Sequence, residues 1–307
     1  MAFLHFLEGL RNPVLDSFFL AITELGGETA FLVLALVYFW CVDKRRGYYL
    51  MSVGFIGTIA NQLLKMWFRI PRPWVRDESF TAVEAAKADA GGYSFPSGHT
   101  QTSVGTFGAI AATDKNRAVQ VISVALAVLV GFSRMYLGVH TPADVLVGAV
   151  MALVLVIGIK PVVYRGGHKG MKILIAAMIA MAIGMLIYVE VNPAGFAADD
   201  VNYLSGLKNA YTMLGCLIGV AIVYFVDYKY LKFETDAIWW AQIIKGVLGL
   251  GVVLAVKEGL RAPLEALMPV YPARAVRYFL IVIVAGILWP MTFKWFAKMG
   301  KKGEEVK

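Results

Sequence analysis

Charged residues are scarce in this chain of 307 residues. Lysine, arginine, aspartate and glutamate together make up 16% of the sequence, while 59% of its residues are hydrophobic. Soluble domains usually contain about 25% charged and about 45–50% apolar residues. This composition excludes an ordinary soluble domain and predicts a polytopic membrane protein.

Cysteine is also rare, and the usual metal-binding patterns are missing. Cys41 and Cys216 each lie inside an apolar stretch, and their spacing fits neither a metal site nor a disulfide framework. We interpret both as small buried hydrophobic residues. The sequence has no HExxH motif, Asp-rich stretch or Cys/His cluster, so we expect neither a metal nor another cofactor. The N-terminus lacks a basic leader and a small-residue cleavage site, so we expect no cleaved signal peptide.

Apolar segments long enough to cross a bilayer recur along the chain. A spanning helix needs about 20 apolar residues, and this criterion predicts an all-α membrane helix bundle with about nine transmembrane helices. A further apolar segment, residues 3–24, carries four charges, and we interpret it as an amphipathic helix at the interface or a short re-entrant piece. The predicted spans are Glu28–Val42, Tyr48–Phe68, Ser97–Thr113, Arg117–Tyr136, Pro142–Tyr164, Met171–Val191, Leu207–Val226, Ile238–Leu260 and Arg277–Met299.

Basic residues are unevenly distributed between the two ends of these spans. Loops rich in lysine and arginine face the cytoplasm, so the N-terminus is expected outside and the C-terminus inside. The net charge of +8 is then explained by these loops and needs no nucleic-acid partner. The cytoplasmic end carries 16 of the 29 cations: Lys44, Arg45, Arg46, Lys115, Arg117, Lys160, Arg165, Lys169, Lys172, Lys229, Lys232, Lys294, Lys298, Lys301, Lys302 and Lys307.

The opposite, outer end holds three short polar blocks. In the first, Lys65 and Arg72 lie seven residues apart, and Pro73 follows. Arginine can fork two phosphate oxygens while lysine acts as a point charge. Placing such cations in hydrocarbon costs roughly 2.5–3.5 kcal/mol each. They form part of an anion site, or they are interfacial cations that extend toward the headgroups.

The second block, Pro96-Ser97-Gly98-His99, opens the third predicted span. Proline suits a helix start and Ser97 can cap it. Gly98 lets the backbone approach a ligand, and the exposed N–H groups favour an anion. His99 would then stand beside a phosphate seat, although the tetrapeptide alone is only a helix-start signature.

The third block crosses the next outer turn. Ser133 and Arg134 close the fourth span, and His140 precedes a helix start at which Asp144 lies in the first turn. A carboxylate bonded to one ring nitrogen would leave the other nitrogen of His140 as a nucleophile. Alternatively, Asp144 only caps its own helix.

Taken together, the blocks resemble the three-part signature of the type-2 phosphatidic acid phosphatase superfamily. That superfamily also includes glucose-6-phosphatase, sphingosine-phosphate phosphatases and vanadium haloperoxidases. The resemblance covers residues 65–144 and implies a metal-independent hydrolase that forms a phosphohistidine. It implies that His140 attacks phosphorus, that Asp144 orients it and that His99 protonates the leaving oxygen and later activates water. The phosphate oxygens would be held by Lys65, Arg72, Ser97, Gly98 and Arg134.

The organisation expected from this resemblance has three parts. Residues 1–27 form the N-terminal segment, 28–164 a catalytic core of five helices and 165–307 a four-helix extension. This layout is similar to glucose-6-phosphatase and sphingosine-phosphate phosphatases in helix count alone. Several outer charges of the extension either cover the catalytic mouth or are ordinary interfacial charges: Lys208, Lys257, Glu258, Arg261, Arg274 and Arg277.

Two further features stay open at this point. The outer loop Trp74–Phe95 contains Gly91-Gly92 as a hinge, and it gates the site, touches the substrate or is a passive connection. Lys245 lies well inside the eighth span, where it extends inward or lines a cavity.

Three functions are compatible with the sequence. The leading one is hydrolysis of a lipid phosphate at the outer leaflet, with a polyprenyl diphosphate, glycerolipid phosphate or sphingoid phosphate as substrate. The second is hydrolysis of a soluble sugar phosphate. The third is a non-catalytic transporter or lipid-binding scaffold, against which His99, His140 and Asp144 are all present as a set.

Overall fold

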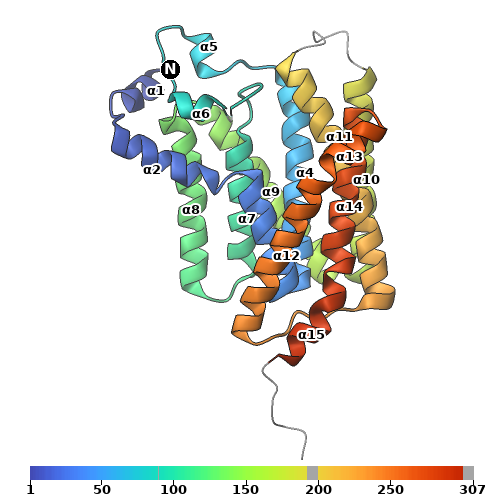
Figure 1. The fold of residues 1–307 in the computed structure, drawn as a ribbon. Coiled ribbons are helices and arrows are strands. Elements are labelled where there is room, and N and C mark those ends of the chain that lie inside the picture. Colours follow the sequence, from blue (N-terminus) through green and yellow to red (C-terminus); the bar gives the residue numbers. More distant parts are fainter. Residues whose placement is uncertain (89, 192–199, 300–307) are drawn as a thin grey trace, which may run out of the picture.

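The structure, a computed structural model, describes residues 1–88, 90–191 and 200–299, and within these ranges every regular element is a helix. Figure 1 shows a bundle of long helices with shorter helices across one end. The long helices of the core are α3 (Glu28–Val37, continued by a π-helical turn at Tyr38–Val42), α4 (Lys44–Phe68), α7 (Gly98–Thr113), α8 (Arg117–Tyr136) and α9 (Pro142–Arg165). Those of the extension are α10 (Gly167–Val191), α11 (Val201–Val226), α12 (Trp239–Gly259) and α14 (Val270–Ile283).

Short helices lie at the ends of the bundle. They are α1 (Ala2–Glu8), α2 (Pro13–Glu24), α5 (Pro73–Arg76), α6 (Glu84–Ala88), α13 (Arg261–Leu267) and α15 (Phe293–Lys298). Helix α2 begins at an Asn12 cap, whose side chain accepts hydrogen bonds from the next backbone N–H groups. Helices α2 and α3 meet at a bend of 47°. The predicted interfacial or re-entrant segment is therefore two helices joined to α3 by a sharp turn.

Six helices of the described ranges are long and apolar enough to cross a membrane, or seven if α2 and α3 count as one broken span. Three predicted spans do not reach this standard alone: Glu28–Val42 passes only together with α2, and the other two are α4 and α7. Helix α7 has only 16 residues, and α4 carries Asn61, Gln62 and Lys65 within its outer half. The integral membrane bundle is thus supported, while the number of nine spans stays a prediction.

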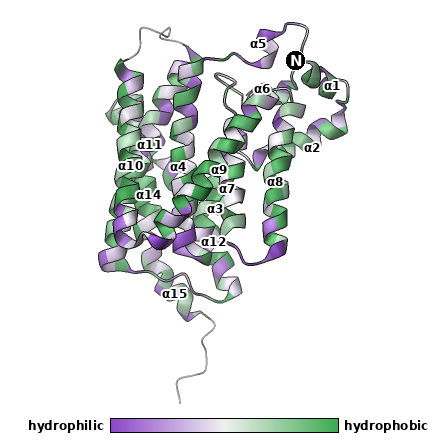
Figure 2. Ribbon diagram, turned by 180° about the vertical axis from the view of Figure 1, so that it is seen from behind, coloured by the Kyte–Doolittle hydropathy of each residue, from purple (hydrophilic) through white to green (hydrophobic). Residues whose placement is uncertain are grey.

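The surface of the bundle fits a lipid environment. Large aliphatic side chains of α8 and α9 point outward, with Val121 66% exposed and Ile157 71% exposed. Figure 2 shows hydrophobic residues along the bundle and hydrophilic residues toward its ends. Since lipid tails are as apolar as these side chains, their exposure costs nothing in a bilayer.

The last predicted span, Arg277–Met299, differs from the structure. Its helix begins earlier, at Val270, and the regular α-helix is interrupted at Val284–Leu288 and again at Pro290–Thr292. Pro290 has no N–H to donate, so the regular α-helical hydrogen bonds are interrupted there, although Val270–Lys298 still counts as one span by length and composition. The short helix α13 was not expected at all.

Helix α4 occupies the centre of the fold. It packs against α7 and α9 of the core and against α10 and α11 of the extension. Its outer end therefore lies where the two halves meet. The side chains that α4 presents there can be reached from both halves, and this junction contains the polar cavity described next.

Candidate active site

All three polar blocks meet at one cavity at the outer end of the bundle. The cavity has a volume of about 210 Å³. Its lining includes Lys65 and Arg72 from the first block, Gly98 and His99 from the second and Arg134 and His140 from the third. Ser97 and Asp144 are buried next to it and do not line it. The structure thus brings the predicted site residues together.

The Arg72 side chain is fixed by backbone carbonyl groups. Helix α4 ends at Phe68, so Arg72 lies in the turn that precedes α5. Its Nε donates to the carbonyl of Gly92 at 2.9 Å, its Nη2 to Gly91 at 3.2 Å and its Nη1 to Val139 at 2.9 Å. A guanidinium held by three acceptors has little freedom to turn, so one orientation is presented to the cavity.

The outer loop therefore contributes to the site. Besides the two glycine carbonyls on Arg72, the carbonyl of Tyr93 accepts a hydrogen bond of 2.6 Å from Nζ of Lys65. Gly92 has a φ of +81°, a conformation that glycine adopts without strain. The loop was expected to gate the site, touch the substrate or connect passively, and it in fact positions both cations of the first block.

His140 is placed with its two ring nitrogens in different surroundings. Nε2 lies 3.0 Å from Nη1 of Arg72, and the residue is only 2% exposed. Because a guanidinium has only donors, Nε2 must be the acceptor, and in the neutral ring the proton is on Nδ1. Nδ1 lies 3.6 Å from Oδ2 of Asp144. This is the tautomer that a nucleophilic Nε2 requires.

Asp144 is held in place by Ser94 and Thr141. Its Oδ2 accepts hydrogen bonds of 2.7 Å from Oγ of Ser94 and of 2.7 Å from the backbone N–H of Thr141. Thr141 completes a reciprocal cap at the start of α9. The two sequence interpretations of Asp144 are thus compatible, since one oxygen caps the helix and also faces His140. The 3.6 Å separation from Nδ1 is too long for a hydrogen bond, and such contacts often tighten only when substrate is bound.

Ser97 caps the start of helix α7, as its sequence context predicts. Its Oγ accepts from the backbone N–H of Thr100 at 3.3 Å and from Oγ1 of Thr100 at 2.9 Å. Its own backbone N–H donates to the carbonyl of Asp144 at 3.0 Å. A Cβ on Gly148 of α9 would lie 2.7 Å from the Ser97 carbonyl, so glycine allows the two helix ends to meet. Ser97 couples the second block to the third.

The N-terminal segment supplies contacts that sequence reasoning missed. Nη1 of Arg134 donates to Oγ1 of Thr23 at 2.6 Å. A Cβ on Gly26 would lie 2.9 Å from the carbonyl of His99, so only glycine fits there without a shift. Gly27 and Glu28 also line the cavity. The end of the N-terminal segment, at Gly26 and Gly27, is therefore part of the site wall.

Helix α1 is attached to the outer loop by polar contacts. The two ring nitrogens of His5 lie 3.0 Å from carboxylate oxygens of Asp77 and Glu8. These hydrogen bonds, chiefly that to Asp77, raise the pKa of His5 above its ordinary value. Nη1 of Arg11 donates to the carbonyl of Thr81 at 2.5 Å. The N-terminal helices thus stabilise the loop that holds Arg72.

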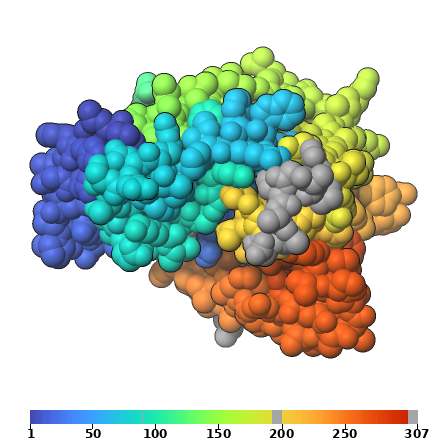
Figure 3. Space-filling model, turned by 90° about the horizontal axis from the view of Figure 1, so that it is seen from above, coloured from blue at the N-terminus to red at the C-terminus, as the bar shows by residue number. Residues whose placement is uncertain are grey.

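Helix α11 of the extension forms another part of the wall. Ser205, Lys208 and Asn209 line the cavity. Figure 3, which looks down on this end, shows the loop in cyan beside the start of α11 in yellow. Of the outer charges considered in the sequence, Lys208 reaches the cavity. Lys257 and Arg261 instead pair with Glu258 at 3.5 Å and Glu265 at 3.4 Å, respectively.

Lys245 does not line this cavity and is held by contacts within the protein. Its side chain is fully buried, and Nζ donates to the carbonyl of Thr235 at 2.8 Å. The ammonium also lies 4.5 Å from the centre of the Phe293 ring. Of the two alternatives left open, the first describes it, because the side chain extends inward to the carbonyl of Thr235.

Two protein-family models match this chain, one over the core and one over the extension. The sequence model of the PAP2 superfamily matches residues 45–168, which include all three polar blocks. The chain belongs to the PAP2 superfamily. A second model, described as a PAP2 superfamily phosphatase transmembrane extension, matches residues 211–302. The chain is thus a membrane phosphatase, a hydrolase of a phosphate ester or diphosphate, and the non-catalytic scaffold considered from the sequence is set aside.

Three curated PAP2 relatives are similar over about half of this chain. The undecaprenyl-diphosphatase BcrC of Bacillus subtilis (strain 168) is 34% identical over 147 residues, 47% of this chain and 73% of that protein. The phosphatidylglycerophosphatase B of the same organism is 30% identical over 48% of this chain and 74% of its own length. A probable sphingosine-1-phosphate phosphatase of Dictyostelium discoideum is 28% identical over 48% of this chain and 38% of its own. No solved structure matches.

Metal binding was not expected from the sequence. In the part of the chain that the structure describes, no group of three or more His, Cys, Asp or Glu side chains is arranged to hold a metal ion. Metal independence stays a prediction, to be tested by chelation. The cations around the cavity are protein side chains, and the proposal below relies on them.

Proposed function

We propose that this protein hydrolyses a lipid phosphate or lipid diphosphate at the outer leaflet through a phosphohistidine on His140. The observation that carries the proposal is the environment of His140, whose Nε2 lies 3.0 Å from Arg72 while its Nδ1 lies 3.6 Å from Asp144. A polyprenyl diphosphate, a glycerolipid phosphate or a sphingoid phosphate is the substrate class. The names of the three curated relatives, all of which refer to phosphorylated lipids, support this choice.

The first half-reaction transfers the phosphoryl group to the enzyme. When phosphate binds, its oxygens take over the Arg72 donor that otherwise occupies the lone pair of His140. Nε2 then forms a bond to phosphorus as the bond to the leaving oxygen breaks. His99 as imidazolium gives its proton to that oxygen. Asp144 stabilises the positive charge that develops on the ring of His140.

The second half-reaction returns the enzyme to its starting state. Neutral His99 takes a proton from a water molecule, whose oxygen attacks phosphorus as the bond to Nε2 of His140 breaks. Lys65, Arg72 and Arg134 stabilise the equatorial oxygens in both steps. The backbone N–H groups around Gly98, at the start of α7, complete the phosphate seat. Ser97, which was predicted to hold phosphate, caps that helix and is fully buried.

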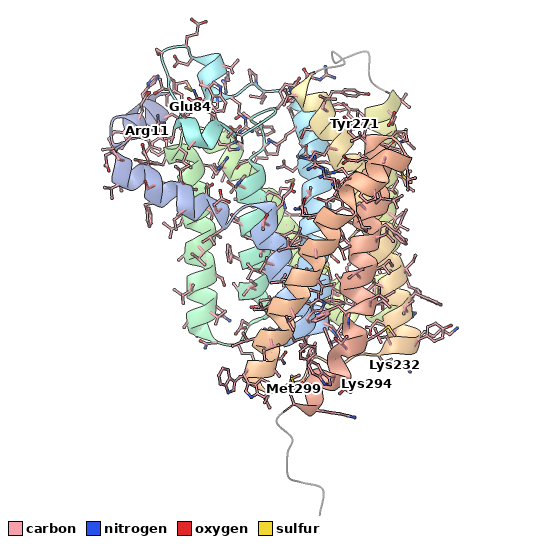
Figure 4. All side chains as sticks on the ribbon, in the orientation of Figure 1. Arg11, Glu84, Lys232, Tyr271, Lys294 and Met299 are labelled. Atoms are coloured by element: carbon pink, nitrogen blue, oxygen red, sulfur yellow. The ribbon has the colours of Figure 1, made fainter. Side chains whose placement is uncertain are left out.

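The proposed orientation places the cavity outside the cytoplasm. Basic residues gather at the opposite end of the bundle, where Figure 4 labels Lys232 and Lys294. At that end, Lys44 of the core pairs with Asp227 of the extension at 2.9 Å. Since loops rich in lysine and arginine stay in the cytoplasm, the cavity faces the periplasm, cell exterior or organelle lumen.

Phosphate release by the purified protein in detergent tests the proposal. We expect hydrolysis of phosphatidic acid, sphingosine phosphate or farnesyl diphosphate, no comparable hydrolysis of glucose 6-phosphate and no activity in His140→Ala. EDTA should leave the rate unchanged. Vanadate should inhibit, because it adopts five-coordinate geometry and resembles the transition state. A preference for glucose 6-phosphate would overturn the lipid assignment, and a metal requirement restored by add-back would overturn the mechanism.

A further inference from the structure

The wall that α11 gives to the cavity is polar and regularly spaced. Lys208 and Asn209 follow Ser205 by three and four residues, a spacing that puts each of them next to Ser205 on the helix surface. All three line the same cavity as His99 and His140. The substrate therefore meets a second set of polar groups besides the phosphate seat.

Lys208 is an unpaired cation that reaches the cavity. Lys257 and Arg261 have carboxylate partners. Lys208, like Arg274 and Arg277, forms no ion pair with any residue in the described ranges, but unlike those two it lines the cavity. Its side chain is exposed at the cavity, so the ammonium is available to a ligand. An unpaired cation on the wall of an anion site favours an additional negative charge there.

The charge of the cavity lining exceeds the needs of one phosphoryl group. Three cations of the signature, Lys65, Arg72 and Arg134, match a single phosphate. Lys208 brings the cations of the lining to four, against the single carboxylate of Glu28.

The cavity residues are supplied by two different parts of the chain. Beside His140, Arg72 and Lys65 are fixed by carbonyls of the outer loop. Ser205 also lines a smaller adjoining cavity together with Gly92 and Tyr93 of that loop. The α11 residues belong to neither family match, since these end at residue 168 and begin again at residue 211.

We propose that Lys208, supported by Ser205 and Asn209, binds the second phosphate of a lipid diphosphate, so that the site prefers diphosphates to monophosphates. This inference rests on the proposed function and narrows its substrate class. In-line attack by His140 on the terminal phosphorus directs the leaving phosphate away from the ring. Lys208 neutralises the charge on that leaving phosphate, while His99 protonates its bridging oxygen.

The test compares two substrates with the same lipid chain, farnesyl diphosphate and farnesyl phosphate. The readout is the ratio of their kcat/KM values in the full-length protein in detergent. In Lys208→Ala we expect this ratio to fall by about 10- to 100-fold, the effect of losing one charge-assisted hydrogen bond. Lys208→Arg keeps the charge and should restore the ratio to within about threefold. Lys257→Ala is the matched control, and its ratio should equal that of the wild type.

Each outcome bears on the inference in a defined way. A ratio that does not change in Lys208→Ala, or an equal loss on both substrates, overturns it while the proposed function stands. If the wild type hydrolyses farnesyl phosphate but not farnesyl diphosphate, the inference is also overturned and the proposed function stands. If the wild type hydrolyses neither ester nor any other lipid phosphate, the proposed function fails, and the inference fails with it. Alanine is a good helix former, so the exposed Lys208 can be replaced without unfolding α11.

Discussion

Nη1 of Arg72 lies 3.0 Å from Nε2 of His140 and 2.9 Å from the carbonyl oxygen of Val139. One guanidinium group thus holds the histidine, its backbone neighbour and the outer loop in a single arrangement. The histidine lone pair points at a cationic donor, which is also where phosphate oxygens would bind. Attack and phosphate binding therefore depend on the same side chain.

Arg72→Lys should lower kcat/KM by at least about 10–100-fold. Lysine keeps the charge but cannot bond simultaneously to the loop carbonyls and His140, and each hydrogen bond of a charged group is worth about 1.5–3 kcal/mol. Steady-state kinetics with a lipid phosphate measures the loss. Arg69→Lys, at the nearby end of α4 and outside the cavity lining, is the matched control and should stay within about twofold of the wild type. Equal rates in both variants would contradict the role of Arg72.

Asp144→Asn should reduce kcat by about 100-fold or more, because the amide cannot stabilise the charged ring of His140. Asparagine can still accept the hydrogen bond from Thr141 N–H, so the start of α9 should persist. Ser94→Ala removes one donor to the carboxylate and should cost about tenfold. Circular dichroism checks that the fold is kept. Full activity in Asp144→Asn would mean that this residue only caps its helix.

His99→Ala should slow esters with poor leaving groups far more than activated ones. General acid catalysis contributes about 10²–10⁴-fold, and a p-nitrophenolate leaving group needs little of it. The measurement compares the kcat of the variant on a lipid phosphate with that on p-nitrophenyl phosphate. If His99 only binds phosphate, both substrates lose rate equally, and its assignment as the acid is wrong.

The cavity end of the bundle should be accessible from outside the cell. Glu78 is exposed in the outer loop and Lys169 is exposed at the basic end. In a background without Cys41 and Cys216, an impermeant maleimide on intact cells should label Glu78→Cys and spare Lys169→Cys. Both should react after permeabilisation. The reverse pattern would place the substrate pool in the cytoplasm without changing the chemistry.

Much of the bundle could be predicted because local signals mark its helices. The interval Arg117–Tyr136 was predicted with its observed bounds, since a cap at Asn116 and a turn after Tyr136 flank an apolar run. The helix starts at Ser97 and Thr141 were likewise predicted from their capping residues. The core helices and the meeting of the polar blocks follow from such short-range patterns.

The rest of the site wall arises from contacts between distant residues. Thr23 reaches Arg134 across 111 positions in the chain, and a neutral threonine in an apolar segment gives no local sign of that partner. Ser205 and Asn209 are similarly inconspicuous in α11. Gly26 matters only because the backbone of His99 packs against it. These positions are set by tertiary packing, which no periodicity within one segment reveals.

The central claim is that His140 carries the phosphoryl group during turnover. Enzyme mixed with a ³²P-labelled lipid phosphate is quenched within milliseconds in alkaline detergent, which preserves phosphohistidine, and its peptides are then mapped. We predict label on the peptide that contains His140 in the wild type and none in His140→Ala. Turnover by His140→Ala, or label on another residue, would contradict the mechanism.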